Sequence, residues 1–556
     1  MKRMILLTGT SIAAFVLIGL SMVSPAAPQT SVSPPSNLNA LMVLDVQDEE
    51  TMWQTVKRIE SAGGRIVHIH PPHVLIGYLD ENTAQQVTML PHVTAIYRDL
   101  VEPAETAQYK ESIVRGIQLW NNLLQISTTT RPANVAATPA MRPDAFLFPT
   151  PTPGGPPPAP GWSETSSYMI GKVVVSIIFP ESNGAIDPST EDWDATRLDH
   201  AQTYVMNGLN WWAARESDAH LTLVYTSPLT VSTGYEPISH SVFPDQKLWI
   251  GDVMTALGYP PPPGEYGYNA AVRNYINALR ASYQTDWAVV AFVVDDLNDS
   301  DNLFADGFSG YAYYNGPFFV ITYGNDGWGP EKMDAIAAHE FGHVFWALDQ
   351  YDYGNGSQTC ADRSGYLYEE NQNLNLQTTC LSDVLSIMRG SVDVGFATNS
   401  LDSYGRGQIG WQDIDGDGIL NPLDTTPVLT VTGYPQDPSP VHAIVYTGTT
   451  YDIPIPSQSP HIPDTTINTI AGVQKRVAGG TWSNSHPSDG AFDSSVEGFT
   501  SVLLLPNGTY TIELRSINSV SNISAIVTDT VVVSSTTPLY ITYLPLALRG
   551  STSWGK

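Results

Sequence analysis

The run His339–His343, HEFGH in one-letter code, constrains the fold more than any other part of this 556-residue chain. Residues four apart in a helix lie one turn apart on the same face, so the two imidazoles can bind one metal ion if the run is helical. Gly329–Glu331 is a typical helix start, with proline in the first turn, and an alanine-rich stretch follows. The sequence therefore predicts a helix that presents His339 and His343 to a metal ion.

The HExxH pattern is typical of zinc hydrolases. Zinc lowers the pKa of a bound water, and Glu340 can accept the proton of that water as it attacks a peptide carbonyl. We therefore expect a zinc endopeptidase that acts on proteins or peptides. The alternative is a chance match on an ordinary amphipathic helix whose apolar face contains Phe341, Phe345 and Leu348.

A catalytic zinc takes three protein ligands, and Asp349 is the first candidate for the third. The spacing from His339 to Asp349, together with the segment Ser386–Arg389, resembles the metzincin clan in a secreted bacterial branch. The resemblance covers roughly residues 169–411 and implies a methionine turn, with Met388 beneath the metal. It also implies that an extended substrate adds to an edge strand, for which Gly310–Tyr323 is the candidate.

One residue departs from the metzincin pattern. Trp346 occupies the position of a glycine that lets the chain leave the helix in a left-handed conformation, which is unfavourable for tryptophan. Either Asp349 still reaches the metal, or the third ligand is Asp352 or one of Glu369 and Glu370, as in a gluzincin-type peptidase. A rival from another class is a cell-surface adhesion or binding protein whose metallopeptidase domain has degenerated.

The N-terminus and the charge balance predict export. Residues 1–27 have a basic start, a long apolar stretch and a small-residue end, as in a secretory signal peptide; an uncleaved membrane anchor is the alternative. The 55 acidic against 25 basic side chains argue against a nucleic-acid partner. In an oxidising compartment Cys360 and Cys380 would pair as a disulfide, the alternative being two buried thiols. We expect a secreted protein, free or associated with the cell surface.

Residues 38–103 predict a small domain with strand-helix-strand-strand-helix-strand order. The expected strands are 41–46, 65–69, 74–79 and 93–97, and the expected helices are 49–62 and 81–90. This order, with Leu75–Asp99, resembles the inhibitor-like propeptides of secreted subtilisin-type proteases; the alternative is an unrelated ferredoxin-like module. The resemblance implies a precursor that is inhibited by its own leader. A proline-rich linker is expected at 104–166.

The metallopeptidase domain is expected at 167–412, in an α+β chain of several domains. Strands at 172–179, 221–225, 287–294 and 317–323 and helices at 191–216 and 270–283 precede the zinc helix. This order is the one that the metzincin resemblance implies, with a mixed sheet beside the zinc helix.

Residues 413–424 predict a calcium-binding loop. Acids at positions one, three and five, a glycine at six and an acid at twelve match a twelve-residue calcium loop. The predicted ligands are Asp413, Asp415, Asp417, Ile419 and Asp424. The aspartate at twelve resembles dockerin and thrombospondin type 3 loops, and a single loop predicts a structural clip between domains.

Residues 428–535 predict a β-domain that resembles immunoglobulin-like or fibronectin-like sandwiches. The expected strands include 428–431, 443–446, 500–505 and 510–516, with Asn507–Gly508 as a hairpin turn. The domain has no catalytic constellation, so we expect it to bind a cell-surface ligand or to act as a spacer. The apolar tail within 536–556 resembles terminal tags of some secreted bacterial proteins, or is a last β-strand.

Overall fold

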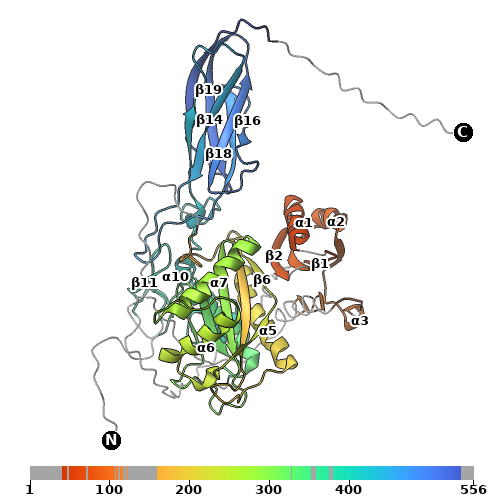
Figure 1. Cartoon of the computed structure of the whole chain (residues 1–556), viewed down its shortest axis with the longest axis vertical. Coiled ribbons are helices and arrows are strands. Elements are labelled where there is room, and N and C mark those ends of the chain that lie inside the picture. Colours follow the sequence, from red (N-terminus) through yellow and green to blue (C-terminus); the bar gives the residue numbers. More distant parts are fainter. Residues whose placement is uncertain are drawn as a thin grey trace, which may run out of the picture. The chain divides into compact units, whose positions relative to one another are not determined.

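The computed structural model describes residues 40–539 without 47–48, 71–72, 122–159, 327, 352–358, 375–379 and a few positions between 107 and 119. The predicted signal peptide, the proline-rich tract, most of the C-terminal tail and Asp352 lie outside the described residues. The chain is a mixed α/β protein that forms two compact units (Figure 1). Of the described residues, the first unit contains those up to 121, 160–422 and 456–465, and the second contains 423–455 and 466–539.

The first part of unit one has the six elements expected of the leader, with ends that differ by at most two residues. They are β1 (Ala40–Leu44), α1 (Glu49–Ser61), β2 (Arg65–His70), β3 (Val74–Tyr78), α2 (Glu81–Thr88) and β4 (Val93–Tyr97). The strands lie in the order β4-β1-β3-β2, and each neighbouring pair is antiparallel. A short helix α3 (Pro103–Thr106) follows, and the buried Trp120 donates its indole N–H to the Asp99 carbonyl at 2.9 Å.

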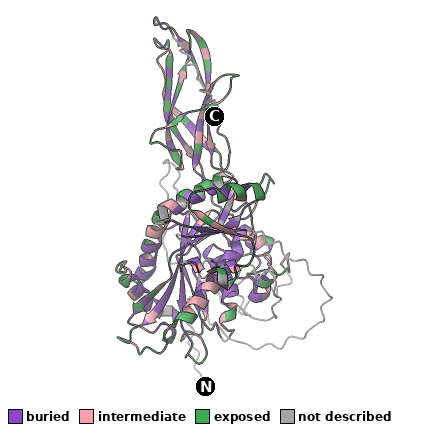
Figure 2. Cartoon of the chain, turned by 90° about the vertical axis from the view of Figure 1, so that its right-hand side faces the viewer, coloured by how far each residue is buried: buried purple, intermediate pink, exposed green. Residues whose placement is uncertain are grey.

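The predicted catalytic region contains a mainly parallel sheet. Its strands are β5 (Lys172–Ser182), β6 (Thr222–Tyr225), β7 (Leu229–Thr233), β8 (Trp287–Val294), β9 (Gly310–Ala312) and β10 (Phe318–Thr322). The order β6-β5-β8-β10-β9 places the antiparallel β9 at one edge, and β7 pairs with the end of β5. All eight residues of β8 are buried, as expected for a parallel strand covered on both faces, and Figure 2 shows buried residues concentrated in this sheet. The expectation of an edge strand within Gly310–Tyr323 is confirmed.

Four longer helices accompany this sheet: α5 (Ala195–Ala213), α6 (Val242–Ala256), α7 (Gly267–Tyr283) and α8 (Met333–Val344). The expected start of α5 at residue 191 is wrong. Asp194 caps the helix, because its carboxylate accepts hydrogen bonds from the N–H groups of Thr196 and Arg197, both at 2.9 Å. Glu191 lies before the helix and accepts from the Asn298 N–H at 2.7 Å. The strand β7 and the helix α6 were not predicted.

Smaller elements complete unit one. They are 3-10 turns at Pro237–Ser239 and Pro330–Lys332, the strands β11 (Arg363–Ser364) and β12 (Glu369–Glu370), and the helices α9 (Val392–Ala397) and α10 (Ser403–Gln408). The part of the predicted linker that follows residue 160 is built into this unit. Residues 163–170 are buried, and Ser166 Oγ donates to the carbonyl of Val344 at the end of α8, at 2.9 Å.

The second unit is built from two four-stranded antiparallel sheets. One has the order β13-β14-β18-β17 and the other β16-β15-β19-β20, with an apolar core of residues such as Tyr446, Phe499 and Leu514. The strands are β13 (Pro427–Gly433), β14 (Ala443–Asp452), β15 (Ile470–Val477), β16 (Ser483–Asn484), β17 (His486–Pro487), β18 (Val496–Leu504), β19 (Gly508–Asn518) and β20 (Val527–Val533), after a 3-10 turn at Asn421–Leu423.

The predicted hairpin at Asn507–Gly508 is wrong. The strands on either side, β18 and β19, belong to different sheets, so this turn carries the chain from one sheet to the other. Asn507 is held by the segment that follows β20 instead of by a hairpin ladder, since its side-chain amide exchanges two hydrogen bonds with the backbone of Ser535, both at 2.9 Å.

Candidate metal centre

The helix α8 carries the HExxH run and is buried along its whole length. All twelve residues are buried, including Glu340. It crosses α5 closely at Gly208, where an added Cβ would lie 2.2 Å from the Asp334 carbonyl oxygen. Trp212 of α5 donates its indole N–H to the Ala338 carbonyl at 2.8 Å. This packing fixes the helix, and with it the direction of both histidines.

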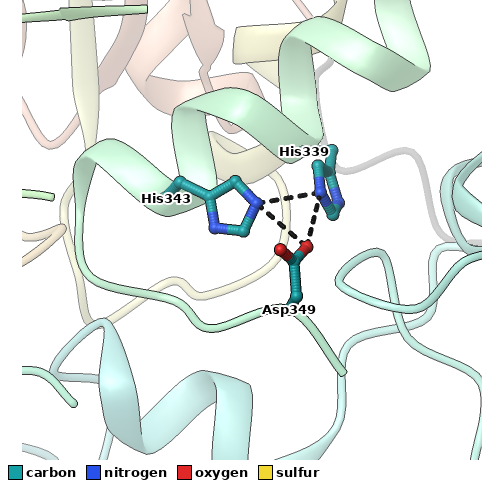
Figure 3. Close-up of side chains that lie close together, drawn as sticks. All are labelled: His339, His343 and Asp349. Carbon is teal, nitrogen blue, oxygen red and sulfur yellow. Dashed lines mark hydrogen bonds and ion pairs between the residues drawn. The ribbon is translucent and has the colours of Figure 1, made fainter. Parts of the chain in front are cut away.

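Three side chains converge beside α8 (Figure 3). The Nε2 atoms of His339 and His343 lie 2.9 Å apart, and Oδ1 of Asp349 lies 3.2 Å from each of them. All three side chains are fully buried. The predicted third ligand therefore meets the two histidines, and this set can hold a metal ion.

The outer nitrogens of both imidazoles face backbone carbonyls. His339 Nδ1 lies 2.9 Å from the Ile387 oxygen, and His343 Nδ1 lies 2.7 Å from the Ala347 oxygen. A carbonyl oxygen can only accept a hydrogen bond, so each Nδ1 carries the hydrogen. In the neutral tautomer this leaves the lone pair of each Nε2 directed at the space shared with Asp349.

This donor set fits a cation. Two nitrogen lone pairs and a carboxylate oxygen at these distances repel one another unless a positive charge lies among them. Burial acts to raise the pKa of Asp349, but protonated His343 and His339 would outweigh burial and hold the pKa below its ordinary value. With both histidines neutral, a cation among the three atoms would act on Asp349 in the same direction and keep it ionised. Two imidazoles with one carboxylate form one of the common zinc sets.

Trp346 has the left-handed conformation that the glycine of the metzincin pattern would have, with φ at 77°. Its ring is stacked on Tyr314 at 6.0 Å between centroids, and Tyr314 in turn lies edge-on to His343 at 5.9 Å. The carbonyl of Trp346 accepts a hydrogen bond from Ser364 Oγ at 2.6 Å. The chain therefore turns at Trp346 and brings Asp349 back to the histidines in spite of the missing glycine.

Met388 is buried beneath α8. A Cβ added at Gly342 would lie 2.9 Å both from the Met388 sulfur and from Cζ2 of Trp212, so a larger residue there would require one of these side chains to shift. The same turn supplies the Ile387 carbonyl to His339, and the Met388 carbonyl accepts from the Gln350 N–H at 2.8 Å. The turn at Ile387 and Met388 thus contacts both His339 and the segment that carries Asp349.

Two of the alternative third ligands, Glu369 and Glu370, lie elsewhere. Glu370 forms an ion pair with Arg363 across β11 and β12, and Glu369 accepts a hydrogen bond from Gln412 at 2.9 Å. Among the described residues, neither belongs to the group that converges with the two histidines.

Buried side-chain amides position the segment that carries Asp349, and sequence reasoning missed them. Asn371 donates to the Asp349 carbonyl at 2.8 Å, and Gln408 accepts from the Leu348 N–H at 2.8 Å. Gln350 donates to Asp402 at 2.6 Å and accepts from Asn373 at 2.9 Å. The alternating asparagines of residues 371–375 were the available signal.

The disulfide between Cys360 and Cys380 is present, as predicted. It closes the loop that contains Asn371 and Asn373.

The predicted calcium loop brings three of its acids together. Carboxylate oxygens of Asp413, Asp415 and Asp417 lie within 4.8 Å of one another. Hydrogen bonds from the N–H groups of Gly418 and Gly416, at 3.0 and 2.8 Å, lower the pKa of Asp413. The N–H of Ile419 donates to Asp417 at 2.9 Å, which leaves its carbonyl, the group expected to ligate at this position, uninvolved in that bond. Asp424 does not belong to the converging group and accepts from the Asn522 amide at 2.8 Å.

Comparison with known proteins identifies no family. No protein-family profile and no curated protein matches the chain. Solved structures give only low overall similarity. The sulfane dehydrogenase SoxCD from Paracoccus pantotrophus is 13% identical, with 18% of this chain and 23% of that chain covered, at a TM-score of 0.13. The corresponding values for astrotactin-2 are 18% identity, 27% and 30% coverage and a TM-score of 0.16.

A β-glucosidase from Listeria innocua is 9% identical over 78% of this chain and 52% of that one, at a TM-score of 0.15. The chain thus spans between about a quarter and about half of these structures. At such TM-scores the likenesses carry no argument about fold or function. No described helix is long and apolar enough to span a membrane.

Proposed function

We propose that this protein is a zinc-dependent endopeptidase, exported as a precursor, with His339, His343 and Asp349 as metal ligands and Glu340 as general base. One observation carries the proposal: the two Nε2 atoms and Oδ1 of Asp349 converge within 3.2 Å while both Nδ1 atoms are occupied by carbonyls. When bound, zinc supplies a Lewis acid that polarises a peptide carbonyl and makes water acidic.

The roles of the chain's own residues follow from their positions. Glu340 follows His339 directly on α8, so its carboxylate lies on the helix that presents both imidazoles and can hold a proton in transit. The edge strand β9 offers main-chain groups to which an extended peptide can add as a further strand. The helix α8, which carries both histidines, packs against β9 and β10. The edge formed by β9 therefore lies next to the helix that carries two of the proposed ligands.

Other features support the wider proposal. The disulfide fits an oxidising compartment, and therefore export. The three converging aspartates of the 413–424 loop support calcium as a second, structural ion. The β-domain is proposed to bind a ligand at the cell surface. The rival proposal of a degenerate peptidase rested on Trp346; its left-handed conformation, with which Asp349 meets both histidines, supports the peptidase proposal.

The experiment compares Glu340→Gln with Glu331→Gln, a matched control on an exposed glutamate before α8. Metal analysis should find one zinc per chain in the parent and in both variants, because neither glutamate is a ligand. Cleavage of casein and of a peptide library should disappear in Glu340→Gln only. If Glu340→Gln cuts as fast as the parent, the proposed mechanism is wrong. If the parent contains no zinc after metal loading, the three side chains are a buried ion pair and not a metal site.

A further inference from the structure

The catalytic sheet continues into the leader domain. The strand β2 of the leader pairs in parallel with β6 of the catalytic region, with His68 opposite Leu223 and Ile69 opposite Val224. The hydroxyl of Thr222 donates a hydrogen bond to the Ile66 carbonyl at 3.1 Å. The two regions that the sequence presents as separate domains therefore share one ten-stranded sheet.

The junction is also apolar. Every residue of β6 is buried, and the leader residues Ile66 and Leu75 belong to the same contiguous apolar cluster as Val174 and Val224 of the catalytic region. Without the leader, β6 would be an edge strand with unpaired N–H and C=O groups. Exposed apolar edge strands are sites of aggregation and mispairing, so β6 needs a cover while the chain folds.

The proposed active site belongs to the other edge. Three strands, β5, β8 and β10, separate β6 from β9, and α8 packs against β9 and β10. Four strand spacings place β6 and β9 about 19 Å apart. A leader that pairs with β6 is therefore on the edge remote from the strand that would receive substrate.

We infer that the leader domain is a folding template for the β6 edge, and that it does not inhibit by filling the active site. The partner is residues 40–97 of the same chain, and the recognition is addition of one β-strand to an open edge. The leader strand β2 fixes the register of β6, the second strand of the catalytic sheet in chain order. The strands that pair with β6 are far apart from it in sequence, and such pairing is slow to form.

The test uses the full chain with a site-specific protease sequence inserted in the proline-rich tract 149–158. After the cut, the leader fragment should co-elute with the rest, and the amides of Leu223 and Tyr225, which alternate with the β5-bonded amides of Thr222 and Thr226, should stay protected from hydrogen exchange. Separation of the leader in urea, followed by return to buffer, should expose these two amides and leave that of Thr222 and those of β9 unchanged. Release of the leader without faster exchange at Leu223 and Tyr225 would contradict the inference.

A pair of variants tests the contact itself. Thr222→Val removes the hydroxyl that reaches Ile66 and should speed release of the cut leader about five- to tenfold. Thr226→Val is the matched control, since its hydroxyl contacts Ser176 within the catalytic region, and release should stay at the parent rate. Equal release rates in both variants would show that the β2–β6 junction does not hold the leader.

The last measurement is the rate of peptide cleavage, and only this measurement depends on the proposed activity. The rate should be the same before and after the cut and after the leader is removed from folded protein. A rate that rises when the leader leaves would show that the leader blocks the active site, and would overturn the inference.

Discussion

Substitution of Trp346 tests the backbone conformation at this residue, on which the position of Asp349 in the candidate metal site depends. A left-handed conformation costs a residue with a side chain about 1–2 kcal/mol relative to glycine, so Trp346→Gly relieves that strain. The indole ring is buried, however, and removal of a buried tryptophan costs about 3–5 kcal/mol. The glycine variant should therefore be less stable than the parent by about 1–4 kcal/mol, in spite of its better backbone.

The comparison with Trp346→Ala isolates the backbone contribution. Both variants leave nearly the same cavity beside Tyr314, so the lost burial cancels between them. At a left-handed position the glycine variant should be the more stable by about 1 kcal/mol. In a right-handed helical conformation the order would reverse by about 0.5–1 kcal/mol. The sign of the difference reports the conformation directly.

Native-state hydrogen exchange of the α8 amides measures these differences, because α8 is fully buried and the method reports the stability of its own unit. The measurement is made in a metal chelator, so that zinc affinity does not contribute. A Trp346→Ala variant as stable as Trp346→Gly, or more stable, would refute the left-handed turn. The route by which Asp349 returns to the histidines would then have to be different.

Three further predictions concern the metal sites and a buried acid. Asp349→Ala should weaken zinc binding by more than about a hundredfold, and Glu370→Ala should not, as measured by competition with a chromophoric chelator; the reverse result would favour a gluzincin-like site. Asp415→Ala should abolish any rise in melting temperature on addition of calcium, and a rise that persists would exclude the 413–424 loop as its cause. Burial raises the pKa of Asp296 to about 7, above its ordinary value of 3.8, so the folded state holds this proton more tightly and loses stability as pH rises through that window. Asp296→Asn should flatten the fall in urea midpoint between about pH 4 and pH 7, and an unchanged slope would assign it to other groups.

The sequence predicted the elements whose pattern is local. The HExxH helix, the leader strands and the all-apolar β8 follow from side-chain periodicity, caps and turn residues, and the structure has them within a few residues. The predicted start of α5 at residue 191 was three residues before the cap. Asp194 caps the helix, and the residues directly before it contain no glycine or proline that would have marked them as lying outside the helix.

Features that depend on distant contacts were not predictable in the same way. Asn507–Gly508 is a common hairpin dipeptide, but which sheet each flanking strand joins depends on core packing in the β-domain. Asn371 and Gln408 are ordinary polar residues until the fold brings them to the backbone around Asp349. Asp349 itself was chosen by spacing, and only the structure shows that Trp346 permits the turn.

The Cys360–Cys380 bridge would link the oxidation state of the protein to the proposed affinity for metal. The loop that the bridge closes supplies Asn371, whose amide holds the backbone of Asp349. Closing a loop of this size lowers the entropy of the unfolded chain and thereby stabilises the folded state by about 3 kcal/mol. Part of that stabilisation would apply to the arrangement of the proposed ligands. Thermodynamic coupling is reciprocal, so whatever factor the bridge adds to zinc affinity, bound zinc adds to the resistance of the bridge to reduction. If zinc binds as proposed, metal and disulfide would protect each other, and at equilibrium with a given reductant a smaller fraction of the metal-loaded protein than of the metal-free protein should be reduced.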